Sequence, residues 1–126
     1  MKYPEYFPQD CPPEDAQTLE IEAYRGCQNN VITRDDFKSY YELGKKCNKV
    51  EAYGVSLFTD FREVQVMMAM PNFRLNHPFI AKGITKSECG EIKYTGKNHK
   101  SHITWWLYED STPEAYFQII EEQDNG

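Results

Sequence analysis

The stretch FIAKGITKSECGEIKYTGKNHKSHITWWLY, residues 79–108, decides the fold because it holds three segments rich in strand-forming residues. These segments span residues 79–85, 91–95 and 101–108. The first two are joined by KSECG at 86–90, whose glycine suits a hairpin loop. The pattern predicts three consecutive strands arranged as an antiparallel meander.

Two further strands are expected upstream of this stretch. Residues 19–26 alternate apolar and polar side chains, which is typical of a strand with one buried face. Residues 50–58, VEAYGVSLF, are also rich in strand formers. Gly54 in their middle indicates either a bulge or a point where something approaches the backbone closely.

Each of these two strands is followed by a predicted helix. Thr33 and Asp36 fit a capping box, and the helix that they begin should continue through Tyr40, Tyr41 and Leu43 and stop at Gly44. The second helix is predicted over 60–70, because Phe61, Val64 and Met68 recur at helical spacing until Pro71.

The two ends of the chain complete the predicted domain. Residues 1–18 contain four prolines and read as an extended arm whose aromatic rings pack on the body. Residues 112–120 predict one helical turn followed by an edge strand. Residues 1–126 are therefore expected to form one α+β domain with a mostly antiparallel sheet of five or six strands and two main helices.

Composition narrows the function classes. The 14 Lys and Arg residues against 20 Asp and Glu residues give a net charge of −6, which disfavours nucleic-acid binding. No apolar run approaches the ~20 residues of a membrane span, and the start Met-Lys-Tyr-Pro is not an apolar leader. We therefore expect a cytoplasmic protein that is not inserted in a membrane.

The cysteines and histidines do not predict a metal site. The four cysteines include no C-x-x-C pair, so reduced thiols are expected, with a Cys27–Cys47 disulfide as the alternative. His99 and His102 are three residues apart, but on a strand this spacing points the two rings to opposite faces. We expect no metal and no cofactor.

Three polar residues on separate predicted strands are candidates for catalysis. Arg25 could present its guanidinium to a phosphate or carboxylate, or it could form a structural ion pair. Ser56 is expected on the buried face with Gly54, where its hydroxyl would need a ligand or a neighbouring strand as partner. His102 shares a strand face with Thr104 and could transfer protons or simply bond a neighbour.

The preferred functional hypothesis is a small protein-interaction or regulatory module with an aromatic surface. Aromatic rings are the usual anchors of protein interfaces. The expected surface combines the arm with residues from the first predicted helix, the first strand and the strand over 101–108. The rings assigned to it are Tyr24, Tyr40, Tyr41, Trp105 and Trp106.

The alternative is a nucleotide-binding enzyme, in which Arg25, Ser56, Tyr94 and His102 converge on one pocket. The succession of an Arg, a Ser and a later His on separate strands is similar to the ADP-ribosyltransferase-like folds in residue type only. That similarity implies a transferase as the form such an enzyme would take. The two hypotheses name different ligands, a protein partner and a nucleotide or other small molecule.

Overall fold

The computed structural model describes residues 1–45 and 47–120, which form one six-stranded antiparallel sheet with two α-helices. The strand order is β4-β5-β2-β1-β3-β6. The strands are β1 (Glu22–Cys27), β2 (Val55–Phe58), β3 (Phe79–Ile84), β4 (Gly90–Tyr94), β5 (His102–Leu107) and β6 (Phe117–Ile119). The helices are α1 (Phe61–Met68) and α2 (Pro71–Asn76), with short 3₁₀ helices η1 (Arg34–Phe37), η2 (Val50–Tyr53) and η3 (Pro113–Tyr116). The predicted α+β class is confirmed.

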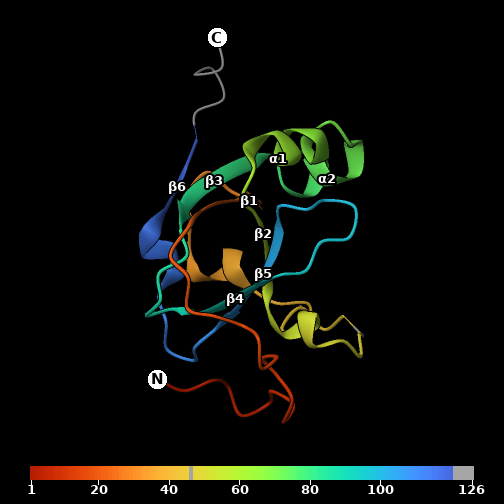
Figure 1. Cartoon of the computed structure of the whole chain (residues 1–126). Helices are drawn as coiled ribbons and strands as arrows, with labels where there is room; N and C mark the ends of the chain where they lie inside the picture. Colours follow the sequence, from red (N-terminus) through yellow and green to blue (C-terminus); the bar gives the residue numbers. More distant parts are fainter. Residues whose placement is uncertain (46, 121–126) are drawn as a thin grey trace.

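The sheet curls around η1, and its inner face forms the core (Figure 1). Phe37 of η1 is fully buried there, with its ring centroid 5.2 Å from that of Phe117 and 6.4 Å from that of Trp105. Inward-facing residues of all six strands surround these rings, as the two-residue period of a strand requires. They include Ala23, Leu57, Ala81, Ile92, Ile103, Trp105 and Phe117.

Two separate parts of the chain cover the outer face. The helices α1 and α2 lie over β1, where Phe61 packs on Tyr24 and Phe73 lies against Gly26. The N-terminal arm covers the outer face of β5, where Cys11 and Ala16 pack against Trp106. Both faces of the sheet are thus buried over part of their area.

Residues 17–21 link the arm to the sheet and cross between its two ends. Gln17 exchanges both backbone hydrogen bonds with Ile92 on the outer side of β4, at 2.8 and 2.7 Å. Four residues later, the Ile21 carbonyl accepts a hydrogen bond from the Thr85 amide at 3.0 Å, just beyond β3. Figure 1 shows this segment running past η1 along one side of the curled sheet.

Several local predictions are confirmed. The capping box is present: Thr33 Oγ1 accepts from the Asp35 amide, and Asp36 Oδ2 accepts from the Thr33 amide. Pro113 begins a helical turn that leads directly into the edge strand β6. A Cβ on Gly54 would lie 2.5 Å from Thr104 Cγ2, so the predicted close approach is that of the neighbouring strand.

The predicted meander is wrong. β4 pairs with β5, whereas β3 pairs with β1 and β6 at the other end of the sheet, so residues 86–90 do not close a hairpin. Instead Thr85 Oγ1 donates to the Leu19 carbonyl at 2.6 Å, and the chain then crosses the fold to β4. A glycine in a loop reports on the loop conformation and not on which strands pair.

The helix predicted through Leu43 stops at Phe37 as a single 3₁₀ turn, because Lys38 adopts extended backbone (φ −91°, ψ 137°). The strand predicted over 50–58 begins only at Val55, since residues 50–53 form η2. Pro71 ends the run of α1 but also occupies the first position of the unpredicted helix α2, where its missing N–H costs nothing.

No helix among the described residues is long and apolar enough to cross a membrane. All four cysteines, Cys11, Cys27, Cys47 and Cys89, are free thiols, so the alternative Cys27–Cys47 disulfide is absent.

Candidate functional site

The residues predicted to form a catalytic pocket do not converge. Arg25 lies on the inner face of β1, where its Nε donates to the Asp36 carbonyl at 2.7 Å and its NH1 donates to the Ser56 carbonyl. Burial lowers the pKa of the guanidinium from its ordinary value. The donors of Arg25 thus tie η1 and β2 to β1, which is the structural alternative to ligand binding.

Ser56 is exposed, contrary to the expectation that its hydroxyl is buried. Its buried neighbours Val55 and Leu57 point into the core, and strand alternation places Ser56 on the outer face. Arg25 contacts only the backbone carbonyl of Ser56, so the two side chains lie on opposite sides of the sheet.

His102 lies on the same outer face as Ser56 but bonds within the protein. Its Nδ1 is 3.0 Å from Thr95 Oγ1, and that hydroxyl is 2.7 Å from Thr104 Oγ1. Burial lowers the pKa of the imidazole, so the neutral form is favoured. Tyr94, the fourth predicted pocket residue, is 52% exposed at the end of β4.

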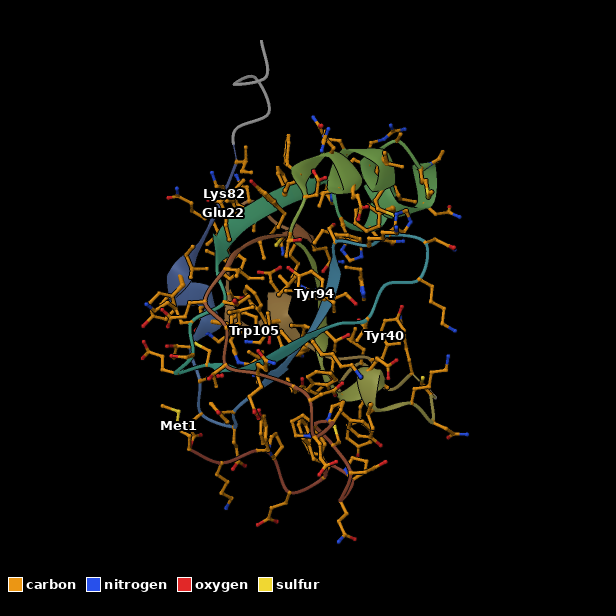
Figure 2. All side chains as sticks on the ribbon, viewed as in Figure 1. Met1, Glu22, Tyr40, Lys82, Tyr94 and Trp105 are labelled. Atoms are coloured by element: carbon orange, nitrogen blue, oxygen red, sulfur yellow. The ribbon has the colours of Figure 1, made fainter. Side chains whose placement is uncertain are left out.

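The two tryptophans are fully buried and cannot anchor a partner on the surface. Trp105 lies in the core, in the middle of the molecule (Figure 2). Trp106 faces the arm, and its Nε1 donates to the Val50 carbonyl at 2.9 Å. Tyr24 is half-buried against Phe61, and its hydroxyl donates to Glu22. The expected aromatic surface therefore does not include the tryptophans.

A different part of that expected surface is present. Tyr6 of the arm stacks on Tyr41 with ring centroids 4.6 Å apart, and Tyr41 stacks on Tyr53 of η2 at 4.9 Å. The interplanar angles are 21° and 30°. Tyr40 and Leu43, in the loop that carries Tyr41, are also exposed. We call these five residues, Tyr6, Tyr40, Tyr41, Leu43 and Tyr53, the tyrosine surface.

The loop over residues 39–45 positions the exposed part of this surface. Ser39 is buried, its hydroxyl accepts from the Glu42 amide, and the Glu42 carboxylate accepts from the Ser39 amide. Gly44 has φ +78°, a left-handed conformation that favours glycine. The Tyr41 amide donates to the Ala52 carbonyl at 3.0 Å, which holds the loop against η2.

The rim of the tyrosine surface is polar. Burial raises the pKa of Tyr6 to about 12, so its hydroxyl is neutral at physiological pH. The Lys45 ammonium lies 4.8 Å from the centroid of the Tyr40 ring, within the range of a cation–π contact. Apolar rings with polar edges are the composition typical of the centre of a protein interface.

The space behind these rings is too small for a substrate. The cavity enclosed by the arm, Phe37, Tyr53 and Trp105 has a volume of about 10 Å³, which is about one water molecule. The described residues also contain no group of three or more His, Cys, Asp or Glu side chains arranged to hold a metal ion. The cavity behind the tyrosine surface is therefore too small to hold a substrate, whereas the exposed rings in front of it offer area for contact.

The sequence analysis did not identify Tyr53 as part of the aromatic surface, because its segment was assigned to a strand. Its spacing of three residues from Val50 also suits a helical turn.

Comparisons with protein-family models, curated proteins and solved structures give no match for this chain.

Proposed function

We propose that this protein is a small protein-interaction module that binds a partner through the tyrosine surface. The observation that carries the proposal is the stack of Tyr6, Tyr41 and Tyr53, which come from three separate segments and leave Tyr6 39% and Tyr41 45% exposed. Solvent-exposed tyrosines immobilised in this way offer contact area at a low cost in side-chain entropy.

Two neighbouring residues extend the contact area. Tyr40 is 55% and Leu43 53% exposed, and both belong to the loop that the Ser39–Glu42 bonds and Gly44 hold in place. A preformed surface binds with less loss of entropy than a flexible one. The net charge of −6 favours encounter with a partner of net positive charge.

Affinity capture with the immobilised chain tests the proposal. The wild type should retain a defined protein from an extract of its source cells, and Tyr41→Ala should weaken the reconstituted complex about 30-fold, as expected for a loss of about 2 kcal/mol at an aromatic hot spot. Tyr40→Ala should weaken it to a smaller extent.

Tyr94→Ala is the matched control, because Tyr94 is as exposed as Tyr40 but lies outside the tyrosine surface. This variant should bind as the wild type does. The proposal is refuted if the wild type retains no protein, or if all three variants lose the same partner equally while remaining folded.

A further inference from the structure

The edge strand β6 has unused backbone hydrogen-bonding groups. The Ile120 amide donates to the Ile80 carbonyl at 2.8 Å, so Ile120, and with it Gln118, faces the paired strand β3. In an antiparallel pair, alternate residues direct both backbone groups to the partner and the others direct them away. The amides and carbonyls of Phe117 and Ile119 therefore point out of the sheet.

The two edges of the sheet differ. On the outer side of β4, Ile92 already exchanges two hydrogen bonds with Gln17. On β6, the outward groups of Phe117 and Ile119 have no backbone partner within residues 1–45 and 47–120. An uncovered strand edge is a template for another extended chain. Figure 1 places β6 at the outside of the curled sheet, on the other side of the molecule from η2.

We propose that β6 binds an extended, basic segment of a partner protein, which adds to the sheet as a seventh strand. The outward groups of Phe117 and Ile119 would supply up to four backbone hydrogen bonds, as in other cases of strand addition. A depression on the outer face, lined by Lys82, Ile84, Tyr116 and Gln118 among others, lies beside this edge and can receive a side chain of the added strand.

The net charge of the protein indicates which kind of segment can bind at β6. Each copy carries −6, so two copies repel one another when their β6 edges approach, whereas a basic segment is attracted. The interaction is therefore expected between this protein and a basic strand, and not between two copies of this chain.

Titration with a synthetic peptide of alternating residues, Lys-Thr-Val-Lys-Val-Thr-Val-Lys, followed by amide NMR, tests this inference. Binding should slow hydrogen exchange at the amides of Phe117 and Ile119 by about tenfold or more, because they become hydrogen-bonded. The same peptide with glutamate in place of lysine should bind much more weakly, and high salt should weaken the basic peptide.

Two variants of Ile119 distinguish binding through the backbone of β6 from binding through the surrounding side chains. Ile119→Pro removes the outward donor without removing a hydrogen bond to β3 and should abolish binding, whereas Ile119→Val keeps the donor and should bind as the wild type does. The spectrum of residues far from β6 reports whether each variant is folded.

The inference is overturned if the basic peptide does not bind at millimolar concentration, if it binds without protecting Phe117 and Ile119, or if Ile119→Pro binds normally. Concentration-dependent dimerisation through β6 would also overturn it. Tyr41→Ala does not alter β6, so this variant should bind the peptide as the wild type does. A failure of the peptide to bind at β6 would therefore not count against the tyrosine surface.

Discussion

Replacing Arg25 with methionine should destabilise the protein strongly, because Arg25 holds three elements together. β1 and β2 share only one pair of opposed residues, Tyr24 and Phe58, so few ladder bonds join them. The guanidinium supplies a bond to each of β2 and η1, at the carbonyls of Ser56 and Asp36. Methionine preserves most of the apolar stem and leaves both carbonyls without their donor.

The size of the effect follows from these two bonds. A hydrogen bond from a charged donor contributes about 1.5–3 kcal/mol, and the lower end applies because the side chain is only partly buried. Two such bonds give a loss of about 3 kcal/mol, which lowers the melting temperature of a chain of this size by roughly 10 °C. Urea denaturation at pH 7 measures the free energy of unfolding directly.

Arg62→Met is the matched control, because the Arg62 side chain is 86% exposed and pairs with Asp60 on the surface. It should change the unfolding free energy far less than Arg25→Met does, because an exposed ion pair contributes little to stability. The reasoning is wrong if Arg25→Met costs no more than Arg62→Met. A variant of Arg25 with normal stability and a lost affinity for nucleotide would instead restore this residue to a ligand-binding role.

Three further outcomes are expected. Thr33→Ala should lower the unfolding free energy by about 1 kcal/mol, since it removes the capping bond to the Asp35 amide, and an unchanged urea midpoint would contradict this. Melting should be the same with and without reductant because all four cysteines are free thiols, and a lower melting temperature under reduction would reveal a disulfide. The folded state lowers the pKa of His102 below its ordinary value of 6.5, so the unfolded chain binds more protons and stability should fall as pH drops below about 6.5. In melting curves between about pH 7.5 and 5.5, His102→Gln should make the stability less dependent on pH. If the variant loses stability as steeply as the wild type, the pH dependence comes from other groups. One such group is His77, because burial lowers its pKa as well.

The segments of the sheet were predictable from sequence, but their pairing was not. β3 and β5 have dense runs of strand formers, and local pattern is enough to locate them. The partners of β3 are β1 and β6, far away in the sequence, and are chosen by packing around Phe37. The helix predicted through Leu43 failed for a related reason: once Phe37 enters the core, Ser39 and Glu42 bond each other in a turn.

The candidate site was predicted in part. Tyr40 and Tyr41 were expected on an aromatic surface together with the arm; both are exposed, and Tyr41 lies beside Tyr6. Trp105 and Trp106 were expected there too, although neighbouring residues of a strand point to opposite faces and one of the two therefore faces the core. The second face, which carries Trp106, was expected to be partly wet. The arm covers that second face, a long-range contact that alternation within one strand cannot reveal.

The arm also dictates an order of assembly during synthesis. Its contacts are with residues made much later, among them Ile92 and Trp106. At the usual rate of translation, roughly 5–20 s pass between the emergence of the arm and that of its partners. Throughout this interval the Tyr3 ring lacks the Tyr108 ring on which it packs in the fold. The four prolines of the arm then reduce the risk of incorrect strand pairing, because they interrupt the row of amide donors that a strand edge would need. This applies to strand edges of the same chain on the ribosome and to those of a neighbouring chain.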